Sequence, residues 1–284
     1  MLFAAISTAF AVPAAAASPK RVWQATLGTS HVVGSAVLTL FPNYTGLARV
    51  TVQGLKPATT YQAMIYKGTC RAPKSLVKLA GMRTDASGSG TRTTALSVSH
   101  GYAIWGVAMH GNIAVRVASG SEVRCSVLQF PRATRVAIPR HGIDLPIVSQ
   151  PSGQYPYCNV AMYSADLSQP GEAGPTFIYA HARTGMFLPL LNASKVKDGA
   201  AMVGMTVKIW TSDSRLYTYT VTRVLRHQYA IPSYDPTVER LWLQTSEGPH
   251  GTRNKLFIVG RRVSVEAASY ADSHPTPHIV VCGF

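Results

Sequence analysis

Four polar side chains near the ends of predicted strands could together support acyl-transfer chemistry. His181 follows the apolar run TFIYA, Ser246 follows LWLQT, and Arg253 and Lys255 flank the start of KLFIV. A hydroxyl attacks a carbonyl carbon when a base removes its proton, and a cation can stabilise the oxyanion that forms. We therefore take His181 as the candidate base and acid and Ser246 as the candidate nucleophile. Arg253 or Lys255 would bind the carbonyl oxygen.

A serine nucleophile also needs a third group that orients its base. Ser246 lies in QTSEG, which lacks the first glycine of the G-x-S-x-G nucleophile elbow. Arg183, two residues after His181, is a further candidate cation. The sequence does not choose among the acids that could orient the histidine: Asp166, Asp198, Asp213 and Glu247.

Short alternating strands fill the first half of the chain, to about residue 130. In LARVTVQGL, Ala48, Val50 and Val52 share one face, and polar residues occupy the other. Such strands at short spacing, without helical periodicity, predict an antiparallel β-sandwich over residues 19–130. GLKPATTYQAMIYKGTC, at 54–70, resembles the loop-strand pattern of chordin-type (CHRD-like) domains. This resemblance implies a β-sandwich and no particular chemistry, so we expect a binding or spacer role.

The second half is also predicted to be mostly β. GMTVKIWTSD and RLYTYTVTRVLRH form a long hairpin with SDSR at its turn, and LWLQT and KLFIVGRRVSVEA add two further strands. GMFLPLLNAS, which contains Pro189, is the one helical candidate. These strands favour a closed barrel over residues 134–284. The fold class is therefore predicted to be all-β.

Two cysteines lie in each half of the chain. Pairing within halves would join Cys70 to Cys125 and Cys158 to Cys282, although four cysteines allow three connectivities and the sequence does not choose. No cysteine or histidine spacing predicts a metal site, and we expect no metal and no organic cofactor. Fully paired cysteines leave no thiol for catalysis. Reaching His181 from either cysteine of the second half would require an unpaired thiol and a rearranged site.

The charge and the first residues favour an exported protein. The chain has 284 residues and a net charge of +15, but its Lys and Arg residues are scattered, with Arg261-Arg262 among the longest groups. This argues against nucleic acid and for anionic partners in general, such as cell-wall polymers. Residues 1–18 form an apolar run ending in small residues, which is typical of a secretory signal. We expect an extracellular or cell-envelope location and a monomer.

The order of the site motifs resembles that of the sortase family, the cysteine transpeptidases that attach proteins to bacterial walls or build pili. IYAH matches the family's histidine motif at His181, and LQTS matches its Thr-x-Thr-Cys-like motif at Thr245 and Ser246. The family arginine lies just before an apolar run such as LFIV. The resemblance spans about residues 134–268 and is nearest to the class E and F enzymes. Two departures stand out: Ser246 replaces the family cysteine, and Lys255 is nearest to the arginine position.

The resemblance implies a sortase-like barrel that acts on, or binds, a peptide or protein sorting signal. One hypothesis is an enzyme that uses Ser246, His181 and Arg253 or Lys255. The alternative is a catalytically silent protein that binds peptide or cell-wall fragments. A calcium site of the kind found in some sortases is not expected, because Asp235 and Glu239 are too few ligands.

Overall fold

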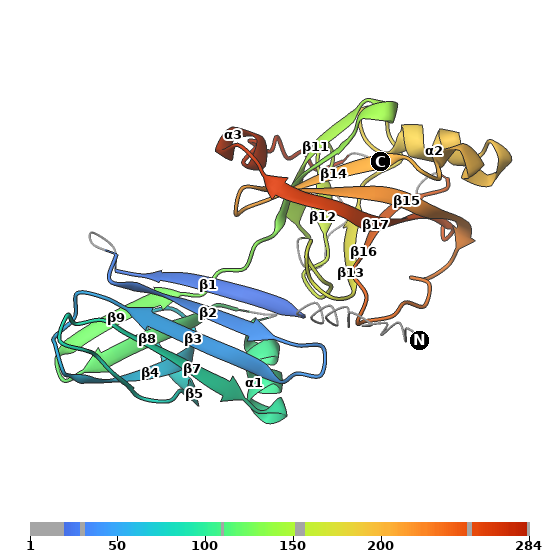
Figure 1. The fold of residues 1–284 in the computed structure, drawn as a ribbon. Helices are drawn as coiled ribbons and strands as arrows, with labels where there is room; N and C mark the ends of the chain where they lie inside the picture. Colours follow the sequence, from blue (N-terminus) through green and yellow to red (C-terminus); the bar gives the residue numbers. More distant parts are fainter. Residues whose placement is uncertain (1–19, 29–31, 109–110, 151–156, 249–251, 283–284) are drawn as a thin grey trace, which may run out of the picture.

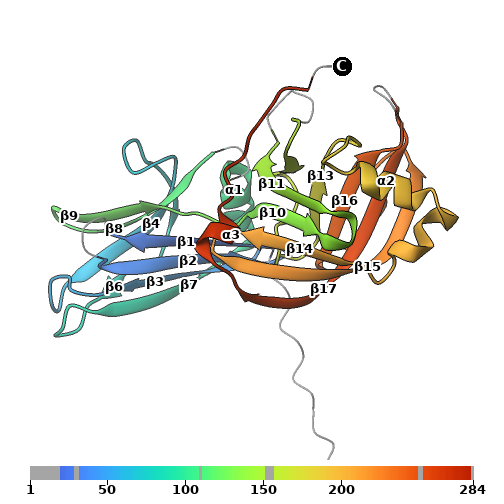
Figure 2. The ribbon, with the colours of Figure 1, turned by 90° about the horizontal axis from the view of Figure 1, so that it is seen from above.

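The computed structural model describes residues 20–28, 32–108, 111–150, 157–248 and 252–282. The chain forms two β-rich units, first a two-sheet unit and then a barrel, which lie side by side in space (Figures 1 and 2). The predicted all-β class, with antiparallel sheets followed by a barrel, is confirmed. The predicted signal at 1–18 lies outside the described residues. Among those described, no helix has both the length and the apolar character that a membrane crossing requires.

The first unit consists of two antiparallel sheets that enclose one hydrophobic core. The predicted alternation is confirmed, because Ala48, Val50 and Val52 are all buried in that core. The first sheet has the order β1-β2-β3-β7: β1 (Arg21–Leu27), β2 (Gly34–Leu40), β3 (Gly46–Val52) and β7 (Gly90–Leu96). The second has the order β5-β4-β8-β9, with β6 beside β4: β4 (Thr60–Lys67), β5 (Lys74–Lys78), β6 (Met82–Arg83), β8 (Ile113–Ser119) and β9 (Glu122–Val127).

Helix α1 (Val98–Ala108) departs from the expectation that the first half lacks helices. Its sequence, VSHGYAIWGVA, is almost uniformly apolar and so has no clear amphipathic period for sequence analysis to detect. Gly101 and Ile104 are buried, and the ring of Trp105 meets that of Trp23 edge-on at 6.3 Å. The helix is therefore selected by tertiary contacts with the sheets.

The second unit is a closed barrel with the strand order β10-β11-β12-β13-β16-β17-β15-β14. Its long hairpin turns between Thr211 and Arg215, as the SDSR motif predicted. The strands of the barrel are β10 (Ala133–Ile138), β11 (Ile143–Ser149), β12 (Ala161–Tyr163), β13 (Pro175–Tyr179), β14 (Thr206–Thr211), β15 (Arg215–Gln228), β16 (Arg240–Ser246) and β17 (Lys255–Ala267).

Short helical segments accompany the barrel strands. The predicted helix around Pro189 is confirmed, and Pro189 lies in its first turn, where the missing N–H has no intrahelical partner to lose. Leu190 and Leu191 of this helix are buried, and Leu190 belongs to the barrel's core. The segments are η1 (Pro139–His141), α2 (Leu188–Ser194), η2 (Lys197–Met202) and α3 (Tyr270–Ser273).

Each unit contains one disulfide, and the pairing within halves is confirmed. Cys70 is bonded to Cys125 in the first unit, and Cys158 to Cys282 in the second. Both bonds close long loops, with sequence separations of 55 and 124 residues. Disulfides of this kind persist in oxidising compartments, which fits the expected export.

A buried ion pair joins the two units. Arg21 of β1 contacts Glu172 of the barrel unit at 3.0 Å, and the two side chains are only 2% and 7% exposed. Arg21 also donates a hydrogen bond to the carbonyl oxygen of Leu167 at 2.9 Å. Burial raises the pKa of Glu172, and the guanidinium of Arg21 opposes that rise. The contact ties the first strand of the chain directly to the barrel.

Candidate functional site

Parallel pairing of β13 and β16 places two of the predicted residues at one edge of the barrel. Tyr179 lies opposite Gln244, and the ladder continues with a hydrogen bond from Ala180 N to the Gln244 oxygen at 3.2 Å. His181 and Ser246 each lie two residues beyond the Tyr179–Gln244 pair. Because parallel strands point the same way, both residues reach the same edge.

Ser246 lies on the outer face of the barrel. Leu241 and Leu243 belong to the barrel core, whereas Trp242 belongs to a separate apolar cluster outside it. Side chains alternate between the two faces of a strand, so Ser246 shares the outer face with Trp242. The same alternation places Lys255 of β17 on this face, together with Phe257 and Val259.

Lys255 contacts the hydroxyl of Ser246 directly. The two residues are paired across β16 and β17, and Lys255 Nζ donates to Ser246 Oγ at 2.9 Å. It also donates to the carbonyl oxygen of Thr252 at 3.0 Å. Burial lowers the pKa of Lys255 from its usual value of 10.5. A lysine whose ammonium form is destabilised in this way is suited to accept a proton.

The hairpin register is the signal that could have revealed this pair. Ser246 ends one antiparallel strand and Lys255 begins the next, so the two residues can lie opposite each other with side chains on the same face. Sequence analysis assigned Lys255 to the carbonyl oxygen of a substrate. The structure brings it to within hydrogen-bond distance of the candidate nucleophile.

His181 lies beside the disulfide of the second unit. One of its ring nitrogens and the sulfur atoms of Cys158 and Cys282 all lie within 4.8 Å of one another. Arg183 Nη1 donates a weak hydrogen bond to Cys158 Sγ at 3.5 Å. The expectation that the site must rearrange before these cysteines approach His181 is therefore wrong, but neither offers the unpaired thiol that the same expectation required, because the two sulfurs are bonded to each other. The C-terminal segment brings Cys282 there through a contact that is distant in sequence and has no local signature.

This sulfur-imidazole cluster has the composition of a metal site but not its chemistry. Thiolates, not disulfide sulfurs, bind metals, and both sulfurs are joined to each other. The cluster would offer thiolate ligands only after reduction.

Three of the four acids proposed to orient the base have other partners. Glu247 contacts Arg226 at 3.0 Å and His227 at 2.8 Å, and Asp198 contacts the same arginine at 3.2 Å. Asp213 lies in the turn of the long hairpin and accepts a hydrogen bond from Thr211. These contacts assign all three acids to local structure. Asp166, the fourth of these acids, is exposed.

Two further residues from sequence analysis have separate surroundings. Arg253 is exposed and precedes β17, so strand alternation does not fix its direction. Glu239, considered as a calcium ligand, accepts a hydrogen bond from Tyr219 at 2.8 Å and contacts Arg262 at 2.8 Å. Asp235 accepts hydrogen bonds from Thr237 within its own turn.

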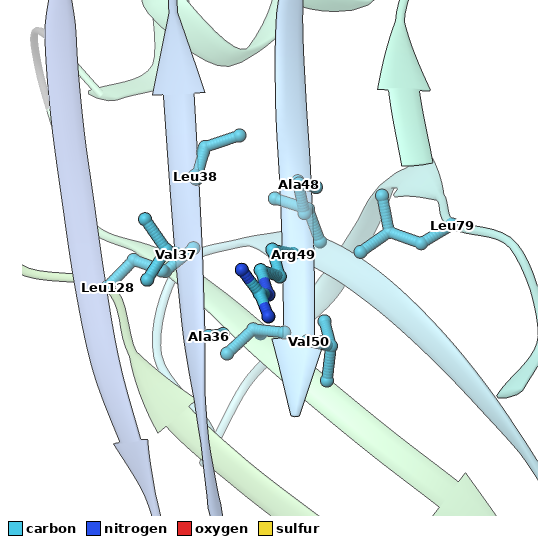
Figure 3. Close-up of a pocket in the computed structure, with 10 residues that line it drawn as sticks. Ala36, Val37, Leu38, Ala48, Arg49, Val50, Leu79 and Leu128 are labelled. Carbon is cyan, nitrogen blue, oxygen red and sulfur yellow. The ribbon is translucent and has the colours of Figure 1, made fainter. Parts of the chain in front are cut away.

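A small cavity between the sheets of the first unit does not form a second site. Its volume is about 10 Å³, which is close to the minimum for a single water molecule. Figure 3 shows mainly aliphatic side chains around it. The lining includes Ala36, Leu38, Val50, Leu79 and Leu128. Such a cavity suits a hydrophobic core and has no room for an organic ligand.

Residues 136–263 match the family model described as Sortase domain. The matched range contains His181, Ser246 and Lys255. A search of curated proteins found no match. This match covers less than half of the chain, and over these residues the chain resembles sortase domains.

Several solved sortase structures are similar to this chain. Sortase C2 from pilus island 1 of Group B Streptococcus is 21% identical with a TM-score of 0.37, covering 46% of this chain and 73% of that one. Sortase A of Listeria monocytogenes is 22% identical with a TM-score of 0.38, covering 48% and 89%. Sortase C1 of Streptococcus suis is 20% identical with a TM-score of 0.38, covering 47% and 74%.

Proposed function

We propose that the barrel unit is a sortase-like acyltransferase or peptide hydrolase that uses Ser246 as its nucleophile and acts on a peptide sorting signal. The observation that carries this proposal is the 2.9 Å contact between Lys255 Nζ and Ser246 Oγ. It lies at the barrel edge that His181 also reaches through the parallel pairing of β13 and β16. In this assignment Ser246 stands at the position of the family cysteine, in a domain nearest to classes E and F.

The contact supplies the base that a serine requires. An alcohol is almost fully protonated near neutral pH, so its proton must be removed as it attacks. Neutral Lys255 accepts that proton while Ser246 Oγ bonds to the carbonyl carbon. Protonated His181 then gives a proton to the leaving amine as the C–N bond breaks.

The second half of the reaction restores both groups. Neutral His181 takes a proton from the incoming amine or water as it attacks the acyl-serine. Lys255 returns its proton to Ser246 Oγ as the ester C–O bond breaks. Exposed Arg253 remains a candidate for binding the peptide's carbonyl oxygen.

A fluorophosphonate probe tests the proposal directly. Incubation of the folded protein should label Ser246, as located by peptide mass spectrometry. Labelling should disappear in Ser246→Ala and fall strongly in Lys255→Met. Ser264→Ala removes an exposed hydroxyl from β17 and serves as the matched control. Absence of labelling in folded protein from about pH 7 to pH 10 would overturn the enzymatic proposal.

The second candidate function is that of a catalytically silent protein that binds a peptide, and one observation favours it. Lys255 Nζ donates to the Thr252 carbonyl as well as to Ser246. Two such donations suit a protonated ammonium that fixes the loop before β17. A silent protein would bind a sorting-signal peptide without probe labelling, which isothermal titration calorimetry would detect.

We further propose that the protein is exported to the cell envelope. The two disulfides, the apolar sequence at 1–18 and the sortase domain support this location. Residues 19–130 would form a chordin-like spacer or binding domain, and residues 134–284 the sortase-like domain. The net charge of +15 would favour contact with anionic wall polymers. Fractionation of the host cell into cytoplasm, envelope and medium, followed by detection of the protein in each fraction, tests the location.

A further inference from the structure

The Cys158–Cys282 disulfide lies among groups that would stabilise a thiolate. Arg183 Nη1 is 3.5 Å from Cys158 Sγ, and a His181 ring nitrogen lies within 4.8 Å of both sulfurs. A cation beside a cysteine favours its ionised form, and a better-stabilised thiolate is a better leaving group in disulfide exchange. Reduction would therefore leave the Cys158 sulfur beside the guanidinium of Arg183.

The described part of the C-terminal segment before Cys282 is largely exposed. This segment follows α3 (Figure 2), and residues 276–281 are all exposed, with Val281 76% exposed. One backbone hydrogen bond, from Cys158 N to the Val280 oxygen at 2.8 Å, accompanies the disulfide. A segment with so few buried contacts depends on its covalent link.

We propose that Cys158 and Cys282 form a redox-active site whose substrate is a protein dithiol. A thiolate of the dithiol attacks Cys282 Sγ, which forms a mixed disulfide and releases Cys158 as a thiolate beside Arg183. The second thiol of the dithiol then attacks the mixed disulfide and releases Cys282. Two electrons pass from the dithiol to the cystine, so the dithiol leaves as a disulfide. The freed C-terminal segment can then separate from the barrel.

This inference does not rest on acyl transfer at Ser246, although the two sites share His181. It requires the sulfur atoms, Arg183 and His181, and it involves neither the Ser246 hydroxyl nor Lys255. Redox activity without probe labelling would leave this inference intact while the proposed acyl transfer fails. Labelling of Ser246 by the probe in a protein whose Cys158–Cys282 disulfide is unreactive would support acyl transfer and overturn the redox inference.

The Cys70–Cys125 disulfide of the same protein serves as the internal reference for the test. Intact protein is equilibrated with mixtures of reduced and oxidised dithiothreitol, free thiols are trapped by acid and alkylation, and each cysteine is quantified by peptide mass spectrometry. We expect Cys158–Cys282 to be reduced at a less reducing ratio than Cys70–Cys125. Arg183→Gln should shift the equilibrium between the Cys158–Cys282 disulfide and its dithiol about tenfold toward the disulfide. This shift corresponds to a reduction potential that is lower by about 30 mV for a two-electron couple.

A matched variant separates the local effect from net charge. Arg261→Gln removes one positive charge from an exposed position near the end of the β16–β17 ladder opposite to Ser246. It should leave the equilibrium unchanged. Arg183→Lys, which keeps a cation beside Cys158, should shift the equilibrium toward the disulfide much less than Arg183→Gln does. Equal reduction of both disulfides in the wild-type protein, with no shift in Arg183→Gln, would overturn the proposal.

A wild-type measurement covers the case in which Arg183 variants fail to fold. After mild reduction, Cys158 should react rapidly with iodoacetamide at about pH 6 to 7. An unperturbed cysteine reacts slowly there, because it ionises near about pH 8.5. Reactivity of Cys158 that rises only near about pH 8.5 would contradict the proposed role of its neighbours.

Discussion

At the scale of single residues, the contact between Ser246 and Lys255 changes the chemistry expected of the site. Three of the acids considered as orienting groups for His181, namely Glu247, Asp198 and Asp213, contact other residues. A lysine with a lowered pKa can serve as base without a third group. In the proposed function, Ser246 at the position of the family cysteine thus has a candidate base at hydrogen-bond distance.

This role predicts how labelling of Ser246 depends on pH. Protonated Lys255 cannot accept a proton, so the rate of fluorophosphonate labelling should be low below its pKa and rise as the pH passes through it. Because burial lowers that pKa, the midpoint should lie below 10.5. Rate constants measured from about pH 6 to pH 11 check this expectation.

Lys255→Arg separates a base from a fixed charge. A guanidinium stays protonated throughout this range and cannot act as a base. The variant should therefore lose roughly 10²- to 10⁴-fold in labelling rate, as expected for removal of a general base. A rate within twofold of wild type would show that Lys255 provides only positive charge.

At the scale of elements, helix α1 depends on one glycine. A Cβ atom on Gly101 would lie 1.8 Å from the Tyr44 carbonyl oxygen, whereas one on Gly106 would meet no atom within 4 Å. The helix therefore packs closely against the backbone of Tyr44 at Gly101, whereas the side of the helix that carries Gly106 is open. The ring of Tyr102 stacks on that of Tyr44 at 4.0 Å, which holds the same contact.

The two glycines predict opposite effects on stability. Gly101→Ala should lower the free energy of unfolding by at least about 1–3 kcal/mol, because the backbone must move to admit the methyl group. Gly106→Ala should raise it by up to about 1 kcal/mol through helix propensity. Urea denaturation of both variants provides the measurement. Equal effects of the two substitutions would contradict the close approach at Tyr44.

At the scale of the whole molecule, the Arg21–Glu172 pair links the two units through a buried charge contact. The guanidinium of Arg21 also lies 4.3 Å from the ring centre of Phe130 and 5.0 Å from that of Trp105. Glu172 additionally accepts a hydrogen bond from Gln169 N at 2.7 Å. These contacts surround an ion pair whose two side chains are almost fully buried.

Breaking this pair should be costly. Arg21→Met leaves the carboxylate buried without its partner, and we expect a loss of about 3–5 kcal/mol in the free energy of unfolding. Arg21→Met with Glu172→Gln removes both charges and keeps an oxygen for Gln169 N, so it should recover part of the loss. Urea denaturation and calorimetry test both variants.

An exposed ion pair supplies the control. Arg215 and Asp213 are 3.6 Å apart, and their side chains are 59% and 32% exposed. Arg215→Met should cost no more than about 1 kcal/mol. If Arg21→Met behaved like Arg215→Met, the junction between the units would contribute little to stability.

Local sequence was sufficient for the strands and the order of the site motifs. The alternation through Ala48, Val50 and Val52, the hairpin turn before Arg215 and the helix at Pro189 all depend on neighbouring residues. The positions of His181 and Ser246 at strand ends belong to this group. Each follows from periodicity or turn chemistry, which a short window of sequence contains.

Tertiary structure alone decided which groups meet at the site. Lys255 reaches Ser246 through the register of β16 and β17, and Cys282 reaches His181 across a separation of about 100 residues. The uniformly apolar α1 is likewise selected by its contacts with the sheets. The approach of Cys282 to His181 and the packing of α1 arise when distant segments bury their apolar faces together, so no local pattern of residues encodes them. The Ser246–Lys255 pair is local in sequence, but it depends on the register that the two strands adopt in the sheet.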